Sequence, residues 1–310
     1  MLKRFSLKKI LVSASVLVTL LIICLVPSED AVKFKQELKY NEELSVNDIY
    51  LLDGYQYVAL TEMPLFTKSI EDQALEIIDV LIEGGPGENK IPSGFKALIN
   101  GETTVNDISI KDEILSIDFS KELLDTKKEY EVKVIESLVY SLTSIKGVKG
   151  IKILIDGKPL EILPQSKIRL PDVLDKSFGI NREYNLTSLK NVSQITIYYL
   201  NKYNDDFYYV PVTKYLNDDR EKVNIIIDEL ANNNSYLTGL MSFMNNKAKL
   251  KDTLIETDEV ILNFDSGILN DVDSKTVLKE VTQSINYSII ANYGIKNVAL
   301  NVDSEPINVN

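Results

Sequence analysis

The sequence predicts an α+β fold made of two tandem repeats, each with two helices packed on a mostly antiparallel sheet, after an N-terminal transmembrane segment. Three observations lead to this prediction. The first is a self-similarity of the chain at an offset of about 147 residues. The second is the alternation of strand-like apolar runs with amphipathic helical stretches inside each copy. The third is an uncharged apolar run near the N-terminus.

The N-terminus holds a basic tail, residues 1–9, and then an apolar run, residues 10–26, that contains no charged residue. As a helix this run would span roughly 25 Å, at the short end of what crosses a bilayer. Basic residues precede it and acidic residues follow it. We therefore predict a cytoplasmic tail, a single-pass anchor in the cell membrane and an extracytoplasmic C-terminal part that begins with a spacer, residues 27–44.

Two other interpretations of residues 10–26 stay open. Cys24, the only cysteine, would be the acylated residue of a lipoprotein, but bulky Ile23 precedes it where the processing enzyme prefers a small residue. A cleaved signal peptide would need small residues at its cleavage site, and no such pattern follows the run. An uncleaved anchor fits the sequence best, and all three interpretations export the same remaining residues.

Composition argues against several classes of function. Histidine is absent, which excludes every Ser-His-Asp triad and every histidine-ligated metal or haem site. A single cysteine excludes disulfides within the chain. The net charge is −12 and no basic stripe follows residue 26, so we predict no nucleic-acid partner. We also predict no catalytic residue, no cofactor and no metal.

The duplication divides the exported part into two copies. Its matched blocks are Tyr140–Asp156 with Tyr287–Asp303, Leu115–Leu124 with Val260–Leu269, and Ile77–Leu81 with Ile226–Leu230. Small differences in offset between the blocks are what loops on a shared core tolerate. We therefore predict a first domain over residues 45–165, a linker over 166–192 and a second domain over 193–310. The linker is short enough to keep the copies adjacent.

Each copy begins with a predicted hairpin and a helix. The hairpins are Ile49–Leu52 with Tyr55–Leu60, and Ile195–Leu200 with Tyr208–Val212. The helices are predicted over Ser69–Glu83 and Asp218–Ala231. In the first of them, apolar residues recur at the spacing of one helical face: Ala74, Ile77, Ile78 and Leu81. Gly84–Pro86 and Asn232–Asn234 are expected to end these helices.

The second half of each copy predicts two short strands, a helix and a final strand. The strands end in the blocks Leu115–Ser120 and Val260–Ser266. The helices are predicted over Glu129–Ser144 and Ser274–Asn292, ended by Gly147 and Gly294. The final strands lead to Asp156 and Asp303.

Four acidic residues could form paired carboxylates for glycan hydrolysis: Asp118, Asp156, Asp228 and Asp303. Asp156 and Asp303 precede turn-like Gly157 and Ser304, so we favour turn and strand-end roles for this set. Two further polar groups are considered as metal-ligand sets and not favoured. Asp271–Lys275 lacks the glycine of a calcium loop, and Asn204–Asp206 is typical of a hairpin turn.

Two other features have a structural and a binding interpretation. Gly84–Gly87 could cradle an anion, but it follows a helix, at the negative end of the helix dipole, so we favour a role in ending that helix. Four tyrosines of the second copy could form a platform for glycans or peptides, although strand packing is the favoured interpretation: Tyr198, Tyr199, Tyr208 and Tyr209.

Several motifs of the first copy resemble the GerMN domain family. They are L-I-E-G-G-P at Leu81–Pro86, I-P-S-G at Ile91–Gly94, L-S-I-D-F-S at Leu115–Ser120, and the glycine-rich strand block Gly147–Gly157. The resemblance extends over residues 45–310. It is strong in the first copy and weaker in the second, which lacks the Gly-Pro and Pro-Ser-Gly elements.

The resemblance implies a fold similar to the ring-building motifs of secretion systems. It also implies a role in sporulation and germination of endospore-forming bacteria, as a non-catalytic extracytoplasmic protein that helps build or localise the channel complex between mother cell and forespore. The expected partners are proteins of that complex, further copies of this chain, and the membrane through residues 10–26. An alternative is a module that binds the cell wall (peptidoglycan) or assists a hydrolase there.

Overall fold

The computed structural model describes residues 45–232, 237 and 239–309 of the chain. The predicted basic tail, anchor and spacer, together with Cys24, lie outside these residues. Among the described residues, no helix is both long enough and apolar enough to cross a membrane. Both repeats belong to one compact unit, Leu44–Asn310.

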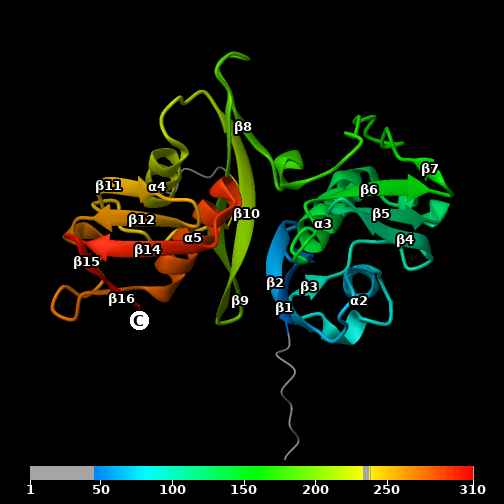
Figure 1. The fold of residues 1–310 in the computed structure, drawn as a ribbon, viewed down its shortest axis with the longest axis horizontal. Coiled ribbons are helices and arrows are strands. Elements are labelled where there is room, and N and C mark those ends of the chain that lie inside the picture. The colour runs from blue at the N-terminus through cyan, green and yellow to red at the C-terminus, as the bar shows by residue number, and fades with distance from the viewer. Residues whose placement is uncertain (1–44, 233–236, 238, 310) are drawn as a thin grey trace, which may run out of the picture. The chain divides into compact units, whose positions relative to one another are not determined.

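The elements follow the predicted order in both repeats (Figure 1). The first repeat contains β1 (Ser45–Asp53), β2 (Val58–Leu65), α2 (Ile70–Leu81), η1 (Glu88–Lys90), β3 (Phe95–Lys96), β4 (Val105–Lys111), β5 (Ile114–Phe119), η2 (Lys121–Leu124), α3 (Lys128–Leu142), β6 (Gly150–Ile155) and β7 (Lys158–Pro159). Between the repeats lie η3 (Lys176–Phe178) and β8 (Glu183–Asn185). The second repeat contains β9 (Ser193–Tyr203), β10 (Asp206–Leu216), α4 (Lys222–Asn232), β11 (Leu250–Ile255), β12 (Glu259–Phe264), η4 (Ser266–Ile268), β13 (Thr276–Val277), α5 (Lys279–Tyr293), β14 (Asn297–Val302), β15 (Glu305–Pro306) and β16 (Asn308–Val309).

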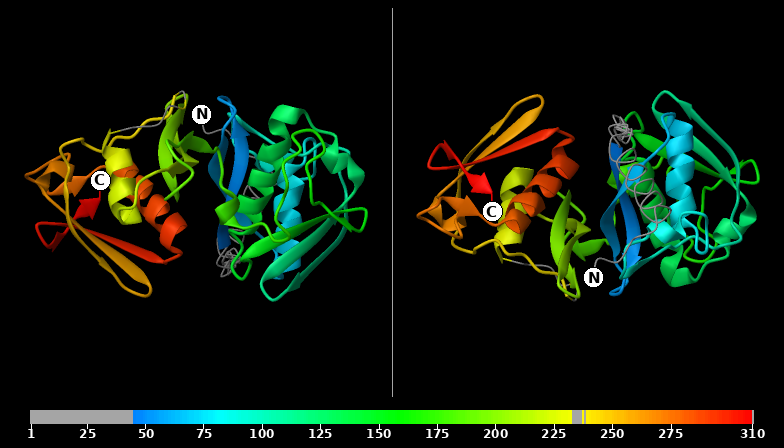
Figure 2. Two further views of the ribbon diagram at one scale, coloured as in Figure 1. Left: turned by 90° about the horizontal axis from the view of Figure 1, so that it is seen from above. Right: turned by 90° about the horizontal axis from the view of Figure 1, so that it is seen from below.

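The fold is α+β as predicted, but each repeat has strands on both sides of its helix pair rather than a single sheet on one side. A four-stranded sheet, β4-β5-β6-β7 or β11-β12-β14-β15, covers one side of the helix pair. The opening hairpin covers the other side, so the helices lie between two β layers (Figure 2). The central pairs β5–β6 and β12–β14 are parallel because a helix connects their strands, and the outer pairs are antiparallel.

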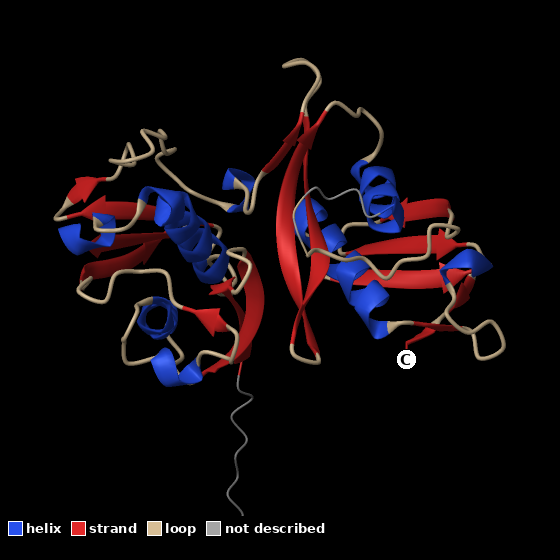
Figure 3. Cartoon of the chain, turned by 180° about the vertical axis from the view of Figure 1, so that it is seen from behind, coloured by secondary structure: helices blue, strands red, loops and turns tan. Residues whose placement is uncertain are grey.

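The hairpins of the two repeats belong to one sheet, in the order β3-β1-β2-β10-β8, with β9 pairing β10. The long hairpin β9–β10 faces the hairpin β1–β2 of the first repeat (Figures 1 and 3). The sequence pattern predicts each hairpin but not their union, because edge pairing between strands far apart in the chain leaves no local signal.

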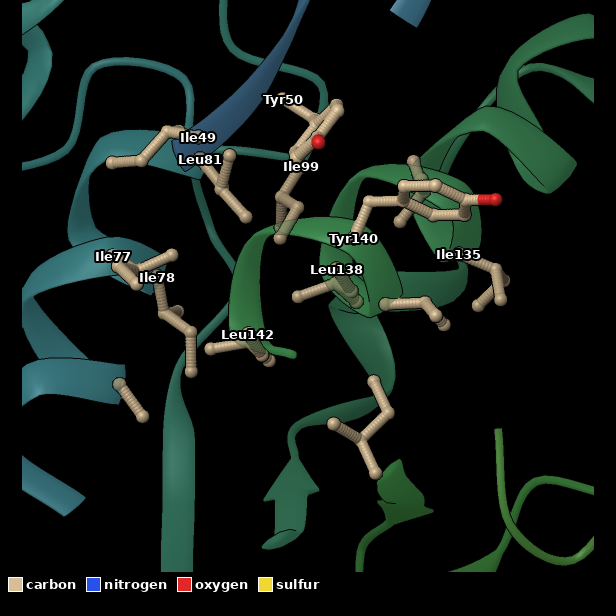
Figure 4. Close-up of a cluster of buried hydrophobic side chains, with 14 of the residues drawn as sticks. Ile49, Tyr50, Ile77, Ile78, Leu81, Ile99, Ile135, Leu138, Tyr140 and Leu142 are labelled. Carbon is tan, nitrogen blue, oxygen red and sulfur yellow. The ribbon is translucent and has the colours of Figure 1, made fainter. Parts of the chain in front are cut away.

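Helix α2 begins and ends where its sequence indicates. The Ser69 hydroxyl accepts a hydrogen bond from the backbone N–H of Asp72, which caps the first turn. All four residues of the predicted apolar face are buried: Ala74, Ile77, Ile78 and Leu81. They pack with residues of α3 and β1 in the core of the first repeat, which Figure 4 shows.

Candidate functional site

Buried polar side chains bind one another where the two repeats meet. We call this contact between the β1–β2 hairpin and the β9–β10 hairpin the seam. At its centre the hydroxyls of Tyr50 and Tyr198 are 2.8 Å apart and buried. Nearby, the Asn201 amide donates to Asp53 at 3.3 Å. Both pairs are separated by 148 residues, so each joins two positions that the duplication makes equivalent. Equivalent residues of the two repeats therefore contact each other here, as they do at the two-fold axis of a symmetric dimer.

Two glycines extend this reciprocal arrangement to the hairpin ends. Gly94 of the first repeat lies so close to the Tyr203 ring that an added Cβ would be 2.6 Å from it. Gly239 of the second repeat lies against Tyr55, where an added Cβ would be 3.2 Å from the ring. Each loop thus contacts the hairpin of the other repeat, and both glycines adopt positive φ, which favours glycine.

Asp53 is the buried acceptor of the seam. One carboxylate oxygen accepts from the backbone N–H groups of Tyr55 and Tyr57, at 2.9 and 2.8 Å. The other accepts from the Tyr208 hydroxyl at 2.8 Å and from Asn201. Burial raises the pKa of Asp53 above its usual value, and these hydrogen bonds oppose that shift. Because its partners come from both repeats, Asp53 binds the two hairpins together.

The strand pairing across the seam is short because Pro211 lies in it. Leu60 of β2 pairs with Tyr209 of β10, and Pro211 has no N–H to continue the ladder. The side chain of Asn181, from the segment between the repeats, bonds to the backbone where this strand pairing is missing. It accepts from the Val58 N–H at 3.0 Å and donates to the carbonyls of Val58 and Pro211, both at 2.8 Å. One buried side chain thus replaces the missing backbone pairing.

An acidic side chain of α3 completes the seam. Glu136 accepts from the Asn181 backbone N–H at 3.2 Å and lies 3.7 Å from the Arg182 guanidinium, which stacks on Phe178. Burial raises the pKa of Glu136 to about 7, against the opposing effects of Arg182, the Asn181 N–H and Lys133. In the second repeat, the equivalent position holds neutral Gln283, which accepts from the Tyr209 hydroxyl at 2.8 Å.

Helix serines satisfy backbone groups of β1 and β9 on the strand edges that face away from the hairpin partner. Ser141 of α3 accepts from the Tyr50 N–H at 2.9 Å, and Ser137 donates to the Tyr50 carbonyl at 2.6 Å. In the second repeat, Ser288 of α5 accepts from the Tyr198 N–H at 2.9 Å. These hydroxyls give the buried backbone groups of Tyr50 and Tyr198 hydrogen-bond partners where a helix covers the strand.

Three of the four carboxylates considered for catalysis have a partner elsewhere in the fold. Asp118 accepts from the Gly157 N–H, Asp228 pairs with Arg220 and Asp303 pairs with Lys251. Asp156 and Asp303 have positive φ and begin the tight turns after β6 and β14. These are the turn and strand-end positions that the sequence favours.

The two other polar segments considered from the sequence both lie in turns. Asp271 accepts from the backbone N–H groups of Asp273 and Ser274, while Lys275 pairs with Glu305. Asn204 has positive φ in the turn between β9 and β10. Among the described residues, no group of three or more acidic or cysteine side chains is arranged to hold a metal ion.

The glycine-rich segment after α2 folds back on the end of that helix. The Gly87 N–H donates to the Asp79 carbonyl at 3.2 Å, and Gly84 has positive φ. An added Cβ at Gly85 would lie 2.6 Å from the Asp79 carbonyl oxygen, so a larger residue does not fit there. The segment therefore sits at the carboxyl end of α2, as the sequence predicts, and its N–H groups face helix carbonyls.

The four tyrosines of the second repeat are sheet residues. Tyr198 and Tyr199 are buried, while Tyr208 and Tyr209 are partly buried with their hydroxyls on Asp53 and Gln283. Strand packing is thus their role in the structure. Exposed aromatic side chains lie at the hairpin ends, on Tyr55, Tyr203 and Phe207, and elsewhere on Phe66 and Tyr184.

The seam residues are not predicted from the sequence, although it contains one signal for them. The block that matches at an offset of 147 residues begins at Tyr140 and Tyr287. One helical turn earlier it would have added Ser137 and Ser284, giving S-x-x-Y-S in both copies. Hydroxyls repeated on the apolar face of a helix indicate buried backbone partners. Asn181 has no such signal, because it lies between the repeats and has no equivalent.

A second feature, on the first repeat, is a groove on the outer face of its four-stranded sheet. Its volume is about 650 Å³, within the range of ligand sites. Outward side chains of β4 and β5 line its floor: Asp107, Ser109, Ser116 and Asp118. The segment 169–174 forms a wall, held beside β6 by the bridge between Ile151 and Leu174.

The fold and the seam define a protein built from two copies of one α+β module, fixed together as a single unit. The family model for sporulation and spore germination, Germane, matches residues 48–161 and 196–308. The spore germination protein GerM of Bacillus subtilis (strain 168) is 33% identical over 270 residues, which cover 86% of this chain and 73% of that protein. The solved structure of the tandem GerMN domains of the sporulation protein GerM from Bacillus subtilis gives a TM-score of 0.76 at 31% identity, covering 84% of this chain and 92% of that one.

The chain therefore belongs to the Germane family of sporulation and spore germination proteins, and the predicted resemblance to tandem GerMN domains is confirmed. Its role lies in sporulation or spore germination.

Proposed function

We propose that the chain is a non-catalytic extracytoplasmic assembly protein that helps build or localise the channel complex between mother cell and forespore. The observation that supports this most is the seam. Buried contacts between Tyr50 and Tyr198, and from Asn181 to both hairpins, hold the repeats as one fixed body. A fixed body has defined outer surfaces, which a repeating assembly needs.

The proposed partners are proteins of the channel complex and further copies of the chain. Residues 10–26 would anchor it in the cell membrane, with the repeats outside the cytoplasm. Such an anchor raises the effective concentration of the repeats at the membrane, so weak contacts between copies suffice for assembly. The polar groups of the seam bind one another, which suits a structural role better than catalysis.

The test is made in sporulating cells of the source bacterium. A fluorescent fusion that folds outside the cytoplasm is expected to concentrate at the septum and around the forespore, and deletion is expected to lower the yield of mature spores. The proposal fails if the fusion spreads evenly over the membrane and the deletion strain forms normal spores.

Cell-wall contact is the second candidate function. The observation that favours it is the exposure of Tyr55, Tyr203 and Phe207 at the hairpin ends, because aromatic rings stack on sugars. Tyr203→Ala combined with Phe207→Ala is expected to abolish co-sedimentation of the protein with purified peptidoglycan if this candidate holds. Unchanged co-sedimentation, or none with the unaltered chain, would exclude it.

A further inference from the structure

The groove on the first repeat contains an unfavourable charge arrangement. Asp107 of β4 lies directly opposite Asp118 of β5 in the antiparallel register, and both side chains line the groove. Like charges at such a cross-strand position destabilise a sheet. Within the described part of the chain no ion pair involves either carboxylate, and Lys152, one of the cations of the groove lining, is bound to Asp172 at 2.6 Å.

In the second repeat, the same position has no such repulsion between carboxylates. Asp252 and Asn263 are the equivalent residues and lie opposite each other in the register of β11 and β12. Here the Asn263 amide donates to the Asp252 carboxylate at 2.9 Å. The first repeat keeps two carboxylates where the duplicated copy has a satisfied pair. A basic group of a ligand placed between the two carboxylates would relieve this repulsion.

We propose that this groove binds an extended segment of a partner protein that carries a basic side chain among apolar ones. The basic group would lie between Asp107 and Asp118, while its apolar neighbours would pack against groove residues such as Leu154 and Leu170. Four carboxylates and two cationic side chains line the groove, so its charge complements a basic ligand. A volume of about 650 Å³ with apolar walls fits a peptide segment better than a bare ion.

The edge of the sheet supports an extended ligand. Strand β4 is the outermost strand of β4-β5-β6-β7, and no other described strand pairs with its outer edge. A flank of the bound segment that adds to this edge would gain backbone hydrogen bonds there, while the part that enters the groove carries the basic and apolar side chains. Asp118 is already fixed by the Gly157 N–H at 2.8 Å, so little ordering is needed when the ligand binds.

The experiment uses the full chain and a short peptide in which a lysine stands between two valines at every second position, with serine at the positions between them and one tryptophan at the end. The chain contains no tryptophan, so the fluorescence anisotropy of the peptide reports binding directly. We expect saturable binding that Asp107→Lys weakens at least about tenfold, which corresponds to about one close charge pair. A peptide with glutamate in place of lysine should not bind.

The matched control is Asp252→Lys, at the equivalent position of the second repeat. It changes the net charge by the same amount, so it separates binding in the groove from general attraction to an acidic protein. A second variant, Asp107→Asn, should raise the unfolding temperature of the free chain while it weakens peptide binding, which excludes misfolding as the cause.

Three results would overturn the proposal. The first is that the peptide does not bind the unaltered chain. The second is that Asp107→Lys and Asp252→Lys weaken peptide binding equally. The third is that calcium alone displaces the peptide from the same carboxylates. The proposal goes beyond the assembly function and does not depend on it, because peptide binding is measured with the purified chain and septal localisation in cells.

Discussion

Replacing Asn181 with alanine is expected to lower the free energy of unfolding by about 3 kcal/mol, the largest effect of any single seam substitution. The variant loses three hydrogen bonds and leaves the buried N–H and carbonyl of Val58 without a partner. Pro211 cannot supply a backbone N–H in their place. Part of the loss comes from the backbone, because Asn181 has a φ of 44°, which alanine tolerates poorly.

Asn181→Gly separates the two contributions. Glycine adopts positive φ without strain, so this variant should lose about 2 kcal/mol from the hydrogen bonds alone. Asn191 is the matched control, because it also has positive φ but is exposed. Asn191→Gly should change the free energy of unfolding by less than about 0.5 kcal/mol. Denaturant unfolding of each variant measures these values, and an Asn181→Gly variant as stable as the native chain would show that the seam does not depend on this side chain.

The stability of the chain is expected to depend on pH through Glu136. Its pKa is about 7 in the folded chain and near 4.5 when unfolded, so the folded state holds the proton more tightly. The free energy of unfolding therefore falls as pH rises through this window. The full contribution is at most about 3 kcal/mol, since one pKa unit corresponds to about 1.4 kcal/mol.

Glu136→Gln removes this titration and copies the neutral residue of the second repeat, Gln283. The stability of the variant relative to the native chain should rise by up to about 3 kcal/mol from acidic to mildly alkaline pH. Lys133 and Arg182 face the carboxylate, so Lys133→Met serves as a control for the charges around it. Denaturant unfolding at a series of pH values checks the expectation. Parallel pH profiles for the native chain and Glu136→Gln would contradict it.

Much of each repeat could be predicted from local patterns. The apolar spacing on α2 gave the buried face, and turn residues such as Asp156 and Gly294 lie at the ends of the elements they were expected to end. The duplication strengthened these predictions, because a pattern that occurs in both copies is less expected by chance than a pattern that occurs once. Predicted helices also extended past their real ends: α5 begins at Lys279, after the short strand β13, which Thr276 and Val277 form.

The union of the repeats could not be predicted in this way. The seam pairs residues 148 positions apart, and its contacts depend on how two separately folded hairpins approach each other. Tyr50 and Tyr198 look like ordinary strand tyrosines in the sequence, and Asn181 looks like a linker residue. The opposed carboxylates of the groove were also missed, because the strand containing Asp107 had no matched block to place it opposite Asp118.

The central claim is that equivalent residues of the two repeats meet in one buried seam. A double-mutant cycle on the hydroxyls of Tyr50 and Tyr198 tests it most directly, because these hydroxyls bind each other across the repeats at 2.8 Å. Burial raises the pKa of both groups, so both stay neutral and the cycle measures a hydrogen bond between neutral partners.

The cycle compares Tyr50→Phe, Tyr198→Phe and the double variant by denaturant unfolding. Each single change should cost about 1–2 kcal/mol, because it leaves one buried hydroxyl unpaired. The double change should cost less than the sum, with a coupling of about 1 kcal/mol. Tyr184→Phe, at an exposed tyrosine, should be additive with Tyr198→Phe. Additive effects of Tyr50→Phe and Tyr198→Phe would show that the two repeats do not meet at these residues and would contradict the account.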